Sequence, residues 1–296
     1  MALSISAVKT DPYGREAVAH GNLAFPVGAY QEDFLVDLVP WHWHEEFETV
    51  IITEGLSHVH VENTILPLRA GEMLFINSGI LHSLNNGLPE PSFGCSVVFH
   101  PRILGDLDTV FWKNYAAPLL QDKRLRFQHF SPDIPWQKEF IDHLATAWDA
   151  VACEPADYEN EVRYHLTKAI SLLLTHYTPF GEVASTHESV AAERTKLMLQ
   201  YIQAHYSEKL TLEQIAASAA VSKSMCLRYF HQIIDTTPIR YLLRYRIEKA
   251  AGLLLSTEKK AGEIATICGF SDISYFTRRF REINGCTPLE YRKENM

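Results

Sequence analysis

Four residues in the first third of the chain have side chains of the types that bind metal ions. His42, His44 and Glu48 lie together in the sequence PWHWHEEFE, and His82 follows later. Residues two apart on a strand point to the same face, so we expect the two neighbouring histidines to lie on one side. Imidazole and carboxylate suit Zn, Mn, Fe or Ni, and the residue types do not choose among these metals.

A second stretch whose residues could bind a partner runs from Ala261 to Arg292, with the sequence AGEIATICGFSDISYFTRRFREINGCTPLEYR. The charge of the chain favours this region for contacts with nucleic acid. Residues 1–189 hold 11 Lys and Arg against 25 Asp and Glu, a net −14, whereas residues 190–296 hold 16 against 11, a net +5; together they give the −9 of the whole chain. A basic second half joined to an acidic first half places any nucleic-acid contact in the second half.

The Ala261–Arg292 stretch predicts a helix-turn-helix. Its first helix carries apolar residues at helical spacing, at Ile264, Ala265 and Cys268. Gly269 ends that helix because only glycine adopts the left-handed backbone without steric cost. Ser271 or Asp272 caps the next helix. The apolar residues expected to face inward from this second helix are Ile273, Phe276 and Phe280. Thr287 and Glu290 then form a capping box around Pro288 at the start of a further helix.

The same pattern occurs twice in the second half of the chain. Residues 212–216, LEQIA, parallel 262–265, and TP at 237–238 parallels TP at 287–288. Matching residues are 49 apart at the beginning of the two units and 50 apart at their ends. One residue is therefore inserted at the start of the second recognition helix. Pro238–Ser256 reads as one long helix between the two units. A stiff connecting helix would let both recognition helices enter successive major grooves, about 34 Å apart.

These residues resemble the DNA-binding domain of the AraC/XylS family of bacterial transcription regulators. The resemblance covers roughly residues 193–292. It rests on residues that have the family's order and spacing: Glu263-Ile264-Ala265, Gly269-Phe270, Tyr275-Phe276, Arg278, Phe280, Gly285, Thr287-Pro288 and Tyr291-Arg292. It implies that residues near the start of each recognition helix contact DNA: Ser224, Leu227 and Arg228 in the first unit, and Ile273, Ser274, Thr277, Arg278 and Arg279 in the second. The alternative for Arg228 and Arg278 is a phosphate contact or an intramolecular carboxylate pair. The first unit departs from the family with Cys226, where a larger apolar residue is common.

Residues 34 to about 100 contain short runs rich in branched and aromatic residues, FLVDLV, FETVIIT, SHVHV, EMLFI and FGCSVVF, separated by polar turns. Many short strands predict a sandwich or a small barrel. The histidines belong to two segments that resemble the sequence motifs of the cupin barrel. The departures are Asn77, where the second motif usually has proline, and Val36, where the first usually begins with glycine.

The cupin resemblance implies that His42, His44, Glu48 and His82 converge on one point. Two interpretations stay open at this stage: a divalent-metal site, with Zn, Mn, Fe or Ni, or a metal-free pocket that binds a small-molecule effector directly. Trp41 and Trp43 alternate with His42, so we expect them on the opposite face, packed against neighbouring strands or helices. The family resemblance also suggests a small carbohydrate as the effector.

Two amphipathic helices are predicted between Gln137 and Tyr177, with a break at Cys153–Ala156. We expect both helices to pack on the β domain. Whether they also form a dimer interface, as in the family, stays open at this stage. Thr178–Ser189 has Pro, Gly and small polar residues without an apolar period, which is typical of a linker.

The predicted fold is α+β and multidomain. Residues 1–177 form a cupin-like domain, with a barrel at about 20–100 and helices at about 137–177; residues 178–190 are the linker; residues 191–296 bind DNA through units at about 211–231 and 261–281. The five scattered cysteines, the lack of a signal peptide and the lack of about 18 consecutive apolar residues favour a cytoplasmic protein.

We expect a homodimeric transcription regulator, an activator by family habit, that binds promoter DNA, a small-molecule effector and RNA polymerase. No catalytic residues are predicted. The alternatives are a metal-dependent cupin enzyme fused to a DNA-binding domain, and a β domain that serves only for dimerisation.

Overall fold

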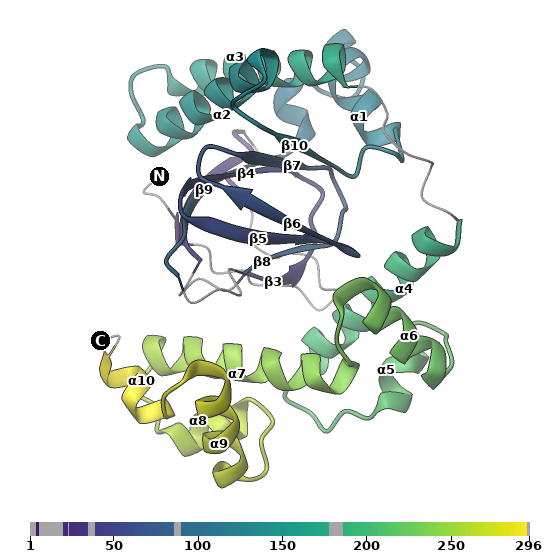
Figure 1. The fold of residues 1–296 in the computed structure, drawn as a ribbon, viewed down its shortest axis with the longest axis vertical. Coiled ribbons are helices and arrows are strands. Elements are labelled where there is room, and N and C mark those ends of the chain that lie inside the picture. Colours follow the sequence, from purple (N-terminus) through teal and green to yellow (C-terminus); the bar gives the residue numbers. More distant parts are fainter. Residues whose placement is uncertain are drawn as a thin grey trace. The chain divides into compact units, whose positions relative to one another are not determined.

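The computed structural model describes residues 4–5, 20–22, 24–34, 39–85, 90–177 and 186–294. The chain forms two compact units, and the division falls between Ser189 and Val190. The first unit is rich in β-strands with appended helices, and the second is helical (Figure 1). Each unit has its own hydrophobic core, as expected for a chain of this length.

The first unit is a barrel of two sheets. The six-stranded sheet has the order β1 (Ser4–Ile5), β2 (Val27–Asp33), β9 (Phe93–Phe99), β4 (Phe47–Glu54), β7 (Met73–Ile76) and β10 (Phe127–Phe130), and the four-stranded sheet has the order β3 (Val39–His42), β8 (His82–Asn85), β5 (Leu56–Val61) and β6 (Thr64–Arg69). Neighbouring strands are antiparallel except β1 and β2. The predicted barrel is therefore confirmed. Of the predicted strand FLVDLV, residues 35–38, including Val36, lie outside the described residues.

Alternation of side chains along the strands builds two apolar layers. On β4, Val50 and Ile52 point into the barrel, whereas Phe47 points to the opposite face. The barrel interior contains a cluster of Phe34, Val39, Val50, Ile52, Val59, Val61, Leu68, Leu74, Ile76 and Leu84. The outer layer packs against α2 (Pro135–Cys153) and α3 (Tyr158–His176), which lie over the six-stranded sheet in Figure 1.

The two predicted helices and the break between them are confirmed. Glu154 ends α2 in the left-handed conformation, and α3 begins at Tyr158. The segment from Pro101 to Phe130 was not predicted from the sequence. It forms η1 (Pro101–Leu104), η2 (Trp112–Ala116), α1 (Ala117–Gln121) and strand β10, which extends the barrel sheet beyond the expected limit near residue 100.

The predicted linker, residues 178–190, overlaps the start of a helix in the structure. Residues 178–185 lie outside the described residues, but helix α4 (Thr186–His205) already begins at Thr186. The polar residues 186–189 carry no apolar period, so they read as linker. They nevertheless belong to the same helix as the buried Ala191 and Ala192.

The second unit contains seven helices among its described residues. After α4 come α5 (Leu212–Ser218), α6 (Lys223–Ile234), α7 (Pro238–Ser256), α8 (Ala261–Ile267), α9 (Ile273–Asn284) and α10 (Pro288–Glu294). Helices α5 and α6 form the first helix-turn-helix unit, α8 and α9 form the second, and α7 connects them. Among the helices that the structure describes, none combines the length and apolar composition of a membrane span.

Candidate DNA-binding surface and the histidine–glutamate cluster

The second recognition helix, α9, begins and ends where the sequence indicates. Asp272, rather than Ser271, is its N-cap, and its carboxylate accepts hydrogen bonds from the backbone N–H groups of Ser274 at 2.7 Å and Tyr275 at 2.9 Å. Gly269 in the turn and Gly285 at the end both have positive φ, +80° and +76°. Phe276 and Phe280 are fully buried. The helix is therefore fixed on one face and open on the other.

Four of the five predicted DNA contacts of the second unit, all except Arg279, line one groove on this open face. Ile273, Ser274, Thr277 and Arg278 lie beside Arg281, Glu282, Gly285 and Thr287 along that groove. The inward placement of Ile273 expected from periodicity is wrong, because its side chain is 53% exposed. It is the first residue of α9, so the buried face of the helix starts only at Phe276. Exposure agrees with the position that the family resemblance gives Ile273.

The two neighbouring arginines of α9 differ in their surroundings. Arg279 donates to Glu282 at 2.6 Å, and this hydrogen bond is the main reason that the pKa of Arg279 is raised. Arg278 is exposed, and among the described residues it forms no ion pair. Both guanidinium groups lie over the Tyr275 ring, at 5.6 Å for Arg278 and 5.2 Å for Arg279. Arg278 is thus the arginine whose donors are left for a base or a phosphate.

The first recognition helix, α6, presents the three predicted residues on its surface. Ser224 and Arg228 are exposed, and Leu227 is 41% exposed. Lys223 is already paired with Glu213 at 2.6 Å, which lowers the pKa of that carboxyl. Cys226, the departure from the family, is fully buried, so its small size is a matter of core packing. The predicted capping box of Thr211 and Gln214 before α5 is confirmed.

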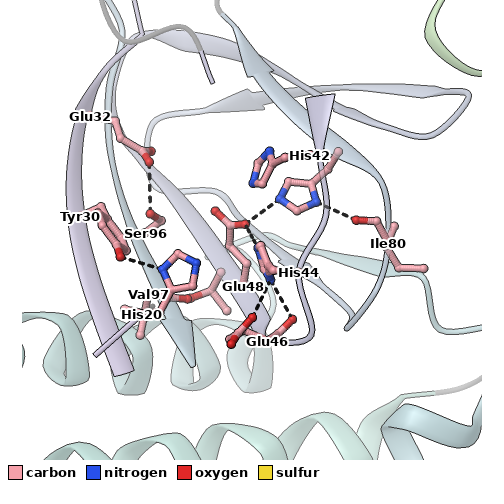
Figure 2. Close-up of polar contacts among 12 residues, drawn as sticks. His20, Tyr30, Glu32, His42, His44, Glu46, Glu48, Ile80, Ser96 and Val97 are labelled. Carbon is pink, nitrogen blue, oxygen red and sulfur yellow. Dashed lines mark hydrogen bonds and ion pairs between the residues drawn. The ribbon is translucent and has the colours of Figure 1, made fainter. Parts of the chain in front are cut away.

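In the barrel, the structure brings the four predicted ligands together. The ligand atoms of His42, His44, Glu48 and His82 all lie within 4.8 Å of one another, and all four side chains are buried. They come from three strands and a loop: β3 supplies His42, the segment after it His44, β4 Glu48, and β8 His82. In Figure 2, His42 and His44 lie beside the carboxylate of Glu48.

Backbone carbonyls fix the orientation of all three imidazoles. The Nδ1 of His42 lies 2.9 Å from Pro40 O, that of His44 3.2 Å from Glu46 O, and that of His82 2.8 Å from Ile80 O. A carbonyl oxygen only accepts hydrogen bonds, so each Nδ1 carries the proton and donates it. Each Nε2 is therefore left as the nitrogen that binds a metal or a further proton.

Two of the Nε2 atoms lie within hydrogen-bond distance of Glu48. Its Oε2 lies 2.8 Å from Nε2 of His82 and 3.1 Å from Nε2 of His44. Burial raises the pKa of Glu48, but the two imidazoles outweigh burial and hold that pKa well below its usual range. An ionised carboxylate facing two imidazole nitrogens requires a cation between or on them, either a proton or a metal ion.

A polar wall continues the cluster along the six-stranded sheet. Tyr30 OH lies 2.6 Å from Nδ1 of His20, and the His20 ring lies 5.4 Å from the His44 ring. Ser96 donates to the buried Glu32 at 3.2 Å (Figure 2). Tyr30, Glu32 and His20 were not singled out from the sequence, because isolated polar residues on a strand carry no motif.

Two further sequence features are explained by the barrel. Asn77, which replaces the usual proline of the second motif, is buried and donates to Leu119 O at 2.8 Å and to Leu125 O at 2.7 Å. It therefore ties the end of β7 to the unpredicted 101–130 segment. Trp41 contacts the His60 ring at 6.0 Å, on the face opposite the cluster, as the alternation predicts.

Comparisons with known proteins agree with both parts of the molecule. Residues 215–294 match the family model of a helix-turn-helix domain, and residues 29–128 match that of an AraC-like ligand binding domain. A ligand-binding β-barrel followed by two helix-turn-helix units defines a DNA-binding transcription regulator with a sensor domain.

The relatives narrow this class to one family. HTH-type transcriptional regulator YisR of Bacillus subtilis (strain 168) is 36% identical over 263 residues, 83% of this chain and 85% of its own. YdeC of the same organism is 28% identical over 95% of this chain and 96% of its own. HTH-type transcriptional activator RhaR of Mannheimia succiniciproducens is 26% identical over 86% and 87%. The chain belongs to the AraC family of transcription regulators, and it is a regulator rather than an enzyme.

Proposed function

We propose that this regulator is an activator whose barrel holds a divalent metal ion between His42, His44, Glu48 and His82 and senses a small polar molecule beside it. The observation that carries the metal is the convergence of four buried ligand atoms within 4.8 Å, together with three Nδ1–carbonyl hydrogen bonds that orient the imidazoles and two Nε2 atoms that face one carboxylate. A hydrogen bond from the other ring nitrogen to a backbone carbonyl orients the histidine ligands of metal sites in this way.

The donor set fits such an ion. Three neutral imidazoles and one carboxylate suit Zn, Mn, Fe or Ni, and they give a 2+ ion a partial charge balance inside an apolar barrel. The metal would neutralise Glu48 and hold β3, β4 and β8 together at one point. The metal-free alternative keeps the same four residues as the direct effector pocket.

The polar wall of Tyr30, Glu32 and Ser96 supports a ligand that bears hydroxyl groups, because hydroxyls pair with both donors and acceptors. A small carbohydrate is such a ligand, and it is the effector class that the family resemblance suggests. The activator role is carried over from relatives such as RhaR, which is named as an activator.

The remaining assignments rest on the membership of the chain in the AraC family. Residues 1–177 would form the sensor domain and 191–296 the DNA-binding domain, in a cytoplasmic homodimer that recruits RNA polymerase. The α2–α3 pair is the proposed dimer surface. Tyr164 of α3 is 56% exposed there, and sedimentation of Tyr164→Glu against the wild type tests this placement.

The experiment for the site is metal analysis of purified protein combined with thermal shifts. We expect one divalent ion per chain, a rise in melting temperature on its addition, and loss of both in His44→Gln and Glu48→Gln. His60→Gln is the matched control, because it removes an imidazole from β5 on the opposite face of the sheet. A ligand at about 100 times its Kd stabilises the folded state by about 2.7 kcal/mol.

The outcomes separate the two interpretations. Metal-dependent stabilisation that is lost in His44→Gln but kept in His60→Gln supports the metal site. Stabilisation by one sugar without any metal supports the direct pocket. Stabilisation by neither contradicts the proposed sensor and leaves dimerisation as the role of the barrel.

A further inference from the structure

Helix α4 occupies a special place in the chain. The division between the two compact units falls inside it, after Ser189. Within the DNA-binding unit its buried face includes Thr195, Met198, Leu199 and Ile202. It is therefore the element through which the chain passes from the sensor domain into the DNA-binding domain.

Through Arg194, α4 contacts the turn of the first helix-turn-helix unit. Arg194 Nη1 donates to Ala219 O at 2.9 Å. Ala219 ends α5, and the next residue, Ala220, has a left-handed backbone with φ +52°. Further along α4, Gln203 donates to the hydroxyl of the buried Tyr241 in α7 at 3.0 Å. A movement of α4 would therefore act directly on this turn.

The turn that directly follows α4, residues 206–208, contacts the turn of the second unit. Arg246 of α7 donates to the carbonyl of Tyr206 and to that of Glu208, both at 2.6 Å, and its guanidinium lies 5.8 Å from the centre of the Phe270 ring. Gly269 lies so close that a Cβ there would be 2.7 Å from Ser207 O and 2.8 Å from Tyr206 O. One arginine thus joins the turn that follows α4 to the turn before α9.

We propose that Arg246 is a positioning residue that couples α4 to the second helix-turn-helix unit, so that α4 and α7 together set the spacing of the two recognition helices. A displacement of α4 by the sensor domain would then change this spacing, which links effector binding to the DNA sites that the protein accepts. This inference rests on DNA binding by both units.

The chain supplies a matched control. Arg292 of α10 makes the same kind of contact with the end of α7, through Leu254 O at 2.8 Å, Thr257 O at 3.1 Å and Lys259 O at 2.8 Å. Arg292 and its three carbonyl partners all lie outside α4 and outside the turn that follows it. Arg292→Ala therefore removes a comparable guanidinium–carbonyl contact without touching the joint between α4 and the second unit.

The test uses full-length protein and a two-part DNA site selected by the wild type from random-sequence duplexes. Affinities are measured for this site, for sites with one or two base pairs inserted between the halves, and for the second half alone. We expect Arg246→Ala to lose about tenfold on the two-part site, to lose less than twofold on the second half, and to tolerate altered spacing better than the wild type. Arg292→Ala should lose equally on all of these sites.

An equal loss for Arg246→Ala on the two-part site and on the second half, with unchanged spacing preference, would overturn the proposal. If Arg246→Ala does not fold, Arg246→Lys keeps the charge and one donor but cannot reach both carbonyls, and the same comparison applies. If the wild type selects no two-part site, DNA binding by both units fails, and amide hydrogen exchange then decides on the coupling. Arg246→Ala must raise exchange in both 203–208 and 266–271, and a rise in only one segment contradicts the joint.

Discussion

The two helix-turn-helix units share a fold but differ in the residues that form the turn and the N-cap of the recognition helix. At the turn, the second unit has Gly269 with φ +80°, whereas the first has Ala220 with φ +52° at the equivalent position, 49 residues earlier. At the N-cap, the second unit has an aspartate that accepts two backbone hydrogen bonds, and the first has Ser222, which accepts one at 3.3 Å.

The cations on the two recognition helices differ as well. In α6, Lys223 is held by Glu213, whereas the exposed Arg228 forms no ion pair among the described residues. In α9, Arg279 is held by Glu282, but Arg278 and Arg281 form no ion pair within the described part of the chain. A cation already paired with a carboxylate contributes less to phosphate or base binding, so we infer that the second unit carries more of the DNA recognition.

The largest expected effect is on the second turn. Gly269→Ala should destabilise the DNA-binding domain by about 2–4 kcal/mol, because a left-handed alanine is strained and its Cβ would clash with Ser207 O and Tyr206 O. Urea unfolding followed by helical circular dichroism measures this loss. A loss below about 1 kcal/mol would mean that the turn is not held against the turn that follows α4.

The next effect concerns DNA recognition. Arg278→Ala should weaken binding to the selected site by about 1–3 kcal/mol and relax the preference at one base pair. Arg228→Ala tests the same position in the first unit, and we expect a smaller loss. If Arg278→Ala weakens binding to random DNA by the same amount, Arg278 contacts phosphate and its assignment to a base is wrong.

The N-caps provide a smaller contrast. Asp272→Ala should cost about 1–2 kcal/mol, and Ser222→Ala about 0.5–1 kcal/mol, because the aspartate accepts two hydrogen bonds at shorter distances. Thermal unfolding of both variants measures the difference. Equal losses would show that the second hydrogen bond of Asp272 adds nothing to the cap.

The smallest effect has the opposite sign. Ala220→Gly should stabilise the DNA-binding domain by about 0.5–1 kcal/mol, because glycine removes the left-handed strain at a cost in backbone entropy. The same unfolding measurement detects it. A destabilisation would show that the methyl group of Ala220 contributes packing that outweighs the strain.

The helical half of the fold was predictable because its signals are local. Pro238–Ser256 is one helix as expected, and Gly269, Thr211 and Thr287 have the predicted turn and cap roles. The left-handed Ala220 was not predicted, because nothing in an alanine marks such a conformation. Ile273 was misplaced because periodicity cannot distinguish the exposed first turn of a helix from its buried continuation.

The barrel was less predictable because its contacts are long-range. The sequence identified the four cluster residues, yet the carbonyls of Pro40, Glu46 and Ile80 that orient the imidazoles are backbone groups without any residue signature. Strand β10 pairs with β7 across about fifty residues, and no local pattern indicates that pairing.

The inferred dominance of the second unit is tested most directly by one binding series. Wild-type protein is titrated against the selected two-part DNA, against the same DNA with the first half scrambled, and with the second half scrambled. We predict the larger loss of affinity, by about tenfold relative to the other, when the second half is scrambled. An equal loss, or a larger loss with the first half scrambled, would contradict the account.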